Sequence, residues 1–94
     1  MREQLKNKLI SELAYSSVNA SKAAEDLCNL KYADLRKGLM DWLRSDTQTV
    51  IQGEPYSTAY LMEKYHMTYP AALIFLEWYR ENPSAAVSVL EMRL

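Results

Sequence analysis

The sequence is poor in the residues that interrupt regular secondary structure. Only two glycines and three prolines occur among its 94 residues. Leucine, alanine, glutamate, lysine and methionine, all of which favour helices, are frequent instead. A fold made of many strands and tight turns needs more turn residues than this chain contains. The composition therefore predicts an all-helical protein.

Cysteine and long apolar segments are also scarce. Cys28 is the single cysteine, so no disulfide can form within the chain, and a reducing cytosol is the expected compartment. The longest apolar run, residues 71–76, is far shorter than the ~20 residues that span a bilayer. The charged residues at the start of the sequence do not lead into the apolar run of a signal peptide. We expect a cytoplasmic protein that does not enter the membrane.

The residues that catalysis and metal binding require are few. His66 is the single histidine, and no motif of a nucleophilic site surrounds it or Cys28. The spacing of His, Cys, Asp and Glu predicts no metal site, and no glycine-rich phosphate-binding loop occurs. We therefore expect a protein that is not an enzyme, needs no metal or cofactor and has no small-molecule substrate.

Neither charge is in large excess. Eleven basic residues stand against twelve acidic residues, which gives a formal net charge of −1. This balance argues against a nonspecific polyanion binder, but it leaves room for a local basic face.

Apolar residues that recur every three or four positions predict five to six short helices in one compact domain. The helices are expected over about 2–15, 31–44, 57–66, 69–81 and 83–94, with one further helix that follows an N-cap at Asn19 or Ser21 and runs to about 28. Gly38 lies inside the third of them, where it is expected to mark a close approach of another helix. Residues 46–55 read as a linker, from which Val50 and Ile51 are expected to return to the core.

A weak internal repeat appears when the sequence is shifted by 36 residues. Residues 21–23 then fall on 57–59, and residues 39–44 fall on 75–80. Unit one (about 20–45) and unit two (about 56–81) would each be a short helix, a turn and a longer helix that ends in acid-Trp-apolar-Arg. Either the chain contains a duplicated helical pair, or two amphipathic helices end alike by coincidence. Trp42 and Trp78 both lie on the apolar face of a longer helix, so both are expected to be buried.

Unit one resembles a helix-turn-helix, in which the turn sets the second helix at an angle suited to the major groove. Its second helix carries Lys31, Arg36 and Lys37, which are candidates for contacts with the phosphates of duplex DNA. The alternative interpretation is an ordinary solvated helix face. The first functional hypothesis is thus a small DNA-binding regulatory protein.

Unit two is similar to the helix-turn-helix in the gamma domain of bacterial DNA translocases. The likeness covers residues 57–79: a first helix that starts at Ser57, a Tyr-His-Met-Thr-Tyr turn at 65–69, and an Ala-Ala pair that opens the next helix. The resemblance implies a helix-turn-helix at this place. The family's reading helix carries arginines, whereas residues 71–76 are wholly apolar. We therefore assign the candidate DNA contacts to unit one.

Two features of unit two favour a protein partner instead. Four of the seven tyrosines lie between residues 56 and 69, and tyrosine suits interfaces because it can bury its ring while its hydroxyl stays wet. Tyr60, Tyr65 and Tyr69 are the candidate partner-binding residues, with packing at the edge of the core as the alternative. The second functional hypothesis is a helical protein-interaction module, such as an adaptor, inhibitor or immunity-type protein.

The helix expected over residues 69–81 is apolar on every side. Such a helix is typically buried all round by the rest of its domain. Where the other helices do not suffice as cover, a face is left for a protein partner or for a second copy in a homodimer.

Overall fold

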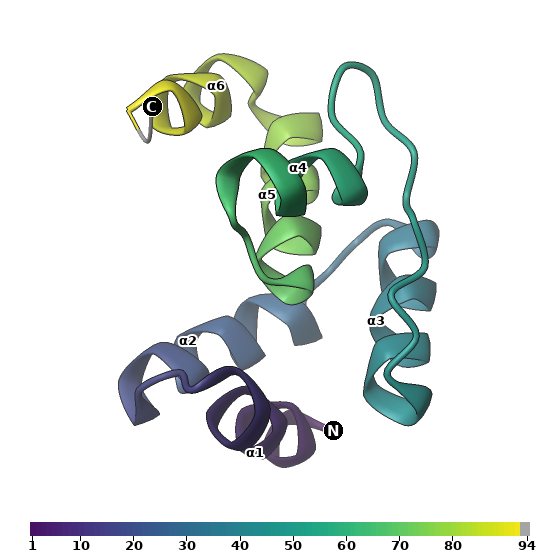
Figure 1. The fold of residues 1–94 in the computed structure, drawn as a ribbon, viewed down its shortest axis with the longest axis vertical. Coiled ribbons are helices and arrows are strands. Elements are labelled where there is room, and N and C mark those ends of the chain that lie inside the picture. Colours follow the sequence, from purple (N-terminus) through teal and green to yellow (C-terminus); the bar gives the residue numbers. More distant parts are fainter. Residues whose placement is uncertain (93–94) are drawn as a thin grey trace.

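Six helices make up most of residues 1–92, the part of the chain that the computed structural model describes (Figure 1). In chain order they are α1 (Arg2–Leu13), α2 (Ser17–Cys28), α3 (Ala33–Ser45), α4 (Thr58–Tyr65), α5 (Tyr69–Glu81) and α6 (Pro83–Glu91). No strand occurs in these residues, and none of their helices is long and apolar enough to cross a membrane. The prediction of an all-helical fold is confirmed. The predicted end of the last helix, at 93–94, lies outside the described residues.

Four of the helices begin at a side chain that caps the first turn. A capping oxygen accepts a hydrogen bond from one of the backbone N–H groups that have no partner inside the helix. The capping residues are Ser16, Ser57, Thr68 and Asn82. The predicted cap of α2, Asn19 or Ser21, is wrong: both residues lie inside the helix, which starts at Ser17 because the Ser16 hydroxyl accepts from the Asn19 N–H at 3.1 Å.

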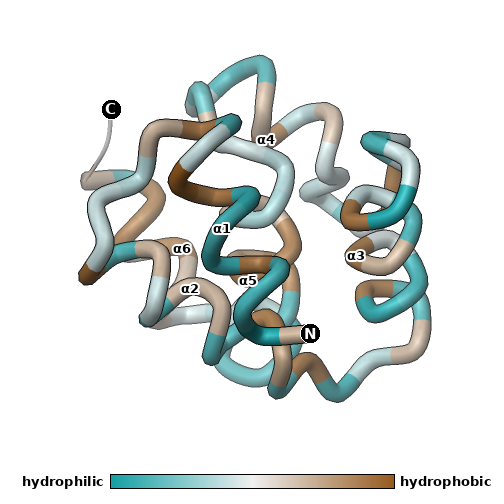
Figure 2. The backbone as a smooth tube through the Cα atoms, turned by 90° about the horizontal axis from the view of Figure 1, so that it is seen from below, coloured by the Kyte–Doolittle hydropathy of each residue, from teal (hydrophilic) through white to brown (hydrophobic). Residues whose placement is uncertain are grey.

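α5 is the central helix of the fold. It packs against α2, α3, α4 and α6, while α1 packs against α2 and α3. Figures 1 and 2 both show α3 on one side of α5 and α6 on the other. All six helices contribute fully buried leucines or equivalent side chains to one core, among them Leu5, Leu27, Leu39, Leu61, Leu73 and Leu90.

Gly38 marks the place where α3 meets the first residue of α5. A Cβ atom at Gly38 would lie 2.6 Å from the hydroxyl oxygen of Tyr69. The same hydroxyl donates a hydrogen bond of 2.7 Å to the carbonyl oxygen of Thr49, in the segment after α3. The predicted close approach is confirmed, and one tyrosine ties α3, α5 and the linker together.

The linker returns to the core at only one of its two predicted residues. Ile51 is buried, and its N–H donates to the Thr58 hydroxyl at 2.9 Å. Val50 is 47% exposed, so the prediction that it packs into the core is wrong. Successive side chains of an extended segment point to opposite sides, so one member of this pair faces solvent when the other faces the core.

The two helical units pack differently. α4 and α5 pack against each other across the turn at residues 66–68, whereas α2 packs against α1 and α5 rather than against α3. In Figure 1 an extended connection leads from the end of α2 across to α3. Unit two therefore forms a packed helix pair and unit one does not.

Candidate functional site

Two of the predicted DNA-contacting residues are engaged with other atoms of the chain. The ammonium of Lys31 pairs with Glu81 at 2.7 Å, and its backbone N–H donates to Glu77 at 2.5 Å. The Arg36 guanidinium donates to the carbonyl oxygens of Leu30 and Lys31. Lys31 is thus turned toward the end of α5, and Arg36 closes the connection between α2 and α3.

Lys37, the third of these residues, lies on the outward face of α3. Its ammonium pairs with Asp41 at 3.1 Å, one helical turn further on. Arg44 is also exposed and lies two turns beyond Lys37, which places both cations on the same face. Arg44 was not among the predicted contacts, although its spacing of seven from Lys37 was visible in the sequence; it also borders a hollow between α1 and α3.

The three predicted partner-binding tyrosines do not share one surface. Tyr60 is exposed and Tyr65 is half-buried; their ring centres lie 6.2 Å apart, with the ammonium of Lys64 over both rings. Tyr69 is only 1% exposed, so its prediction as a partner-binding residue is wrong. It opens the central helix beneath α3, and burial raises the pKa of its hydroxyl to about 12.

The two tryptophans lie in different environments. Trp42 is 3% exposed, and the ammonium of Lys8 from α1 lies 4.8 Å from its ring centre. Trp78 is 38% exposed, so the prediction that it is buried is wrong. The reason is that the face of α3 that carries Trp42 meets α1 and α5, whereas Trp78 lies where α5 borders two hollows of the surface.

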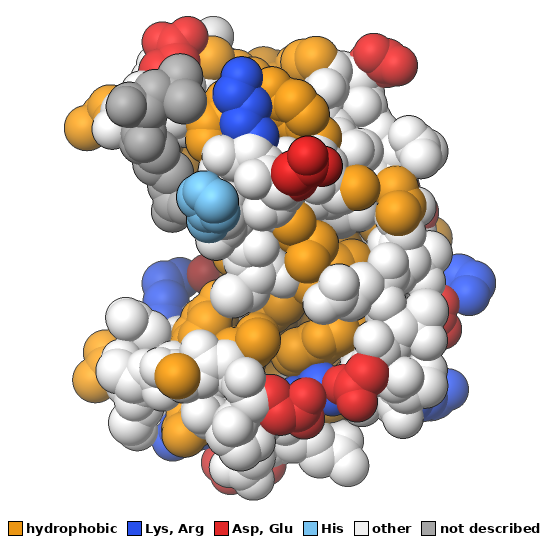
Figure 3. All heavy atoms as spheres, in the orientation of Figure 1, with side chains coloured by type: hydrophobic (Ala, Val, Ile, Leu, Met, Phe, Trp, Pro, Cys, Tyr) orange, Lys and Arg blue, Asp and Glu red, His pale blue; other side chains and the backbone are white. Residues whose placement is uncertain are grey.

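The side of α5 that carries Trp78 forms the floor of an apolar groove. Ala71, Ile74 and Trp78 follow one another along it at intervals of three and four residues, and α6 forms one wall. The groove, called the α5–α6 groove below, has a volume of about 210 Å³ and is lined by Tyr15, Met67, Ala71, Ile74, Phe75, Trp78, Val89 and Leu90. Figure 3 shows the molecule hollowed between α2 and the part formed by α4 and α6, with apolar side chains visible in the hollow.

Under the 36-residue shift, the groove residues of α5 correspond to residues of α3 that are buried. With the 36-residue shift, the α3 stripe of Leu35, Gly38, Leu39 and Trp42 falls on Ala71, Ile74, Phe75 and Trp78. In α3 this stripe is covered, by Tyr69 and Ile51 at Gly38 and by Lys8 at Trp42. In the equivalent stripe of α5, Phe75 is buried, Ala71 and Ile74 are half-buried and Trp78 is exposed. α5 therefore presents a surface of the kind that the chain elsewhere buries.

Beyond Trp78 the groove leads to an acidic end. Ile74 and Trp78 also border a neighbouring hollow whose lining includes Asp26, Glu77 and Glu81, named the acidic end below. α2 and α5 both terminate here, and the partial negative charge at helix C-termini adds to that of the three carboxylates. Two cations lie close to these carboxylates, since Lys31 pairs with Glu81 and Lys22 pairs with Asp26; they offset the negative charge only in part.

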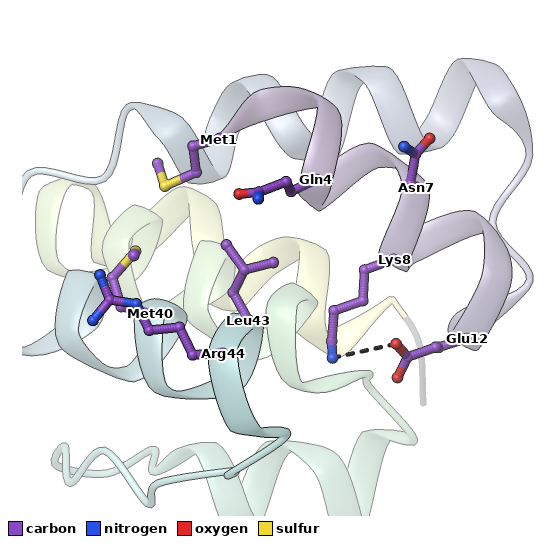
Figure 4. Close-up of a pocket in the computed structure, with 8 residues that line it drawn as sticks. All are labelled: Met1, Gln4, Asn7, Lys8, Glu12, Met40, Leu43 and Arg44. Atoms are coloured by element: carbon purple, nitrogen blue, oxygen red, sulfur yellow. Dashed lines mark ion pairs between the residues drawn. The ribbon is translucent and has the colours of Figure 1, made fainter.

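A second hollow lies between α1 and α3 (Figure 4). It measures about 690 Å³ and is lined by Met1, Gln4, Asn7, Lys8, Glu12, Met40, Leu43 and Arg44. Lys8 reaches across it and pairs with Glu12 at 3.3 Å and with Asp46. Because the central ammonium already has two carboxylate partners and the lining is mixed, this hollow is a weaker candidate site than the α5–α6 groove.

The residues considered for chemistry lie at helix ends. His66 is exposed and ends α4 in the left-handed conformation, with φ of 57°. Cys28 is half-buried in the last turn of α2. Within residues 1–92, no group of three or more His, Cys, Asp and Glu side chains is arranged to hold a metal ion.

Comparisons with known proteins add no family to this description. No protein-family model matches the chain, and neither a curated protein nor a solved structure matches it. The functional argument therefore starts from the α5–α6 groove and its surroundings.

Proposed function

We propose that this protein is a helical interaction module that binds one helix of a partner protein in the α5–α6 groove. The observation that carries the proposal is the apolar groove along α5, which ends at the exposed residue Trp78. Burial of apolar surface is the main driving force of protein association, and tryptophan is enriched among the residues that dominate interface energies.

The dimensions of the groove suit a helix better than a small ligand. Its floor runs along α5 from Ala71 to Trp78, or about 10 Å of length, which is the span of apolar side chains at i, i+4 and i+7 of a partner helix. A volume of about 210 Å³ is below the ~300 Å³ at which sites for drug-sized molecules begin. The groove can receive a few apolar side chains of a longer ligand.

The helix-turn-helix hypothesis has less support in the geometry. Unit one lacks a packed helix pair, and the side chains of Lys31 and Arg36 form hydrogen bonds with other groups of the chain. In unit two, α5 is the central helix of the core rather than an exposed reading helix. The feature that favours DNA is the outward face of α3 with Lys37 and Arg44.

The proposal can be tested by photo-crosslinking in cells. A photoreactive amino acid at Val89, which is 41% exposed on the wall of the groove, is expected to give one discrete adduct. The matched control carries the same amino acid at Val18, which is more exposed but lies on α2 outside the groove. Ala71→Glu places a charge in the groove floor and is expected to abolish the adduct at Val89.

The identity of the adduct decides between the occupants. A cross-linked peptide from an amphipathic helix of another protein supports the proposal. An adduct of twice the protein's mass that carries only this chain's own peptides shows that a second copy fills the groove. Equal cross-linking at Val18 and Val89, or none at Val89, contradicts the proposal.

A further inference from the structure

The contact between α1 and α3 shows how this chain covers a tryptophan-bearing stripe. Lys8 of α1 is itself only 10% exposed and places its ammonium 4.8 Å from the centre of the Trp42 ring. The ammonium also binds Asp46, which directly follows α3, and Glu12 on its own helix. A cation over an indole face is attracted by the ring's electrons, and the adjacent carboxylates hold it in place.

The α5–α6 groove also has a tryptophan beside carboxylates, although these carboxylates stand at other positions than Asp46 and Glu12. Trp78 stands where Trp42 stands under the 36-residue shift, and Glu77 and Glu81 lie beside it at the acidic end. Lys31 also lines this hollow: its ammonium contacts one oxygen of Glu81 and its backbone N–H contacts one oxygen of Glu77. Within the described residues, the hydrogen bonds leave the second oxygen of each carboxylate for a further donor. The indole and the carboxylates together form an acceptor for one further cation.

We infer that the partner helix carries an arginine or lysine that lies over Trp78 and pairs with Glu77 and Glu81, as Lys8 does at Trp42. The inference rests on the proposed function, since it names the kind of helix that the groove accepts. No helix of the described residues covers Trp78 as α1 covers Trp42, so we assign the cation to the partner helix. The partner is thus recognised as a basic amphipathic helix, with its apolar side chains on Ala71 and Ile74.

The test is selection from a phage-displayed library of amphipathic helical 14-residue peptides with randomised polar positions. Binders are selected on the full-length protein and counter-selected on its Ala71→Glu variant. We expect the enriched peptides to carry Arg or Lys at one end of the helix. Their affinity, read from the emission of Trp78 in a Trp42→Phe background, is expected to fall about tenfold in the Glu77→Gln/Glu81→Gln variant, which is the loss of one favourable charge contact. The matched control is Glu63→Gln, an exposed carboxylate on α4 outside the groove, which is expected to leave the affinity unchanged.

Failure of the inference differs from failure of the proposed function. Apolar helices enriched without any basic bias, and bound equally by the Glu77→Gln/Glu81→Gln variant, overturn the inference and leave the groove as a docking site. No enrichment over the Ala71→Glu variant overturns both. Enrichment of acidic peptides also overturns the inference, because it shows that the acidic end does not select the partner.

Discussion

At the scale of single residues, the contact between Gly38 and Tyr69 decides how closely α3 approaches α5. Glycine inside a helix costs about 1 kcal/mol relative to alanine, and this cost is retained because a Cβ atom would lie 2.6 Å from the buried Tyr69 hydroxyl. That hydroxyl is fixed by its hydrogen bond to Thr49 and has no room to move aside without breaking it. The clash and the helix propensity therefore act in opposite directions at one position.

The first prediction is that the effect of Gly38→Ala on the stability of the fold depends on the residue at position 69. In the wild-type background it is expected to destabilise the fold by about 1–2 kcal/mol, because overpacking outweighs the gain in helix propensity. In a Tyr69→Phe background, which removes the clashing oxygen, the same substitution is expected to be neutral or to stabilise by up to about 1 kcal/mol. Urea denaturation of the four proteins of this double-mutant cycle measures both values. Equal destabilisation in both backgrounds would show that Ile51, 3.3 Å away, is the limiting neighbour.

A second residue-scale contact joins α3 to α5 by an ion pair. The Arg80 guanidinium binds both carboxylate oxygens of Asp34, at 2.8 and 2.7 Å, and lies over the ring of Tyr32. This pairing with Arg80 holds the pKa of the Asp34 carboxyl below its usual value. A pKa that is lower in the folded state contributes stability above the unfolded-state pKa of about 4, and the contribution is lost as the pH falls through the folded-state value.

The second prediction follows from that sign. Asp34→Asn is expected to lower the free energy of unfolding at pH 7 by up to about 1 kcal/mol, since half of the Asp34 side chain is exposed and solvent weakens the pair. The difference from wild type is expected to shrink as the pH is lowered below about 4. Thermal unfolding between neutral and acid pH measures it. Arg80→Gln serves as the control, because it removes the same pair and should give the same pH dependence.

At the scale of helices, α3 and α5 show that similar apolar stripes can have different surroundings. The stripe of α3 is covered by α1, the linker and the start of α5, whereas the equivalent stripe of α5 forms the floor of the groove. Trp42 and Trp78 occupy corresponding places in the two stripes. Their substitution therefore compares a covered helix face with an open one.

The third prediction is that the two tryptophans contribute unequally to stability. Trp42→Ala is expected to cost about 3–5 kcal/mol, as for other fully buried large side chains. Trp78→Ala is expected to cost no more than about 1–2 kcal/mol, because much of its ring is already in water. The melting temperatures and the emission maxima of the two single-tryptophan variants measure this. Equal costs, with blue-shifted emission from both rings, would show that the groove is closed in solution.

Local sequence patterns were sufficient to predict the helices but not which of their faces other helices bury. Periodicity and turn residues place α3, α4 and α5 within about two residues, because both signals act over a few neighbouring positions. Whether Trp78 or Tyr69 is exposed depends on which distant helix lies over it, and a stripe pattern carries no information about that. Gly38 was an exception, since a glycine that lowers helix propensity signals a close neighbour without naming it. The apolar character of α5 likewise pointed to an unfilled face, although not to Ile74, Trp78 and Val89 in particular.

At the scale of the whole molecule, charge separates the two functional hypotheses. A net charge of −1 gives the protein no general attraction for nucleic acid. Lys37 and Arg44 are exposed cations of the predicted DNA-binding helix that lie on the same side of α3, two turns apart. Arg36 is unsuited to a charge-removal test because its guanidinium holds the chain before α3.

The fourth prediction is that wild-type protein does not shift random duplex DNA even at about 50 mM salt, where phosphate contacts are strongest. The Lys37→Ala/Arg44→Ala variant is then expected to bind the groove's partner helix as wild type does, since both residues are remote from the α5–α6 groove and exposed charges add little to stability. Electrophoretic mobility shifts at about 50 and 200 mM salt measure the first expectation.

The control is Lys6→Ala/Lys22→Ala, which makes the same change in net charge on α1 and α2. If α3 contacts DNA, the wild type binds at low salt, the Lys37→Ala/Arg44→Ala variant loses about two charges from the salt slope, and the control variant does not. That pattern would establish DNA binding through α3, because only a local contact distinguishes two variants of equal net charge.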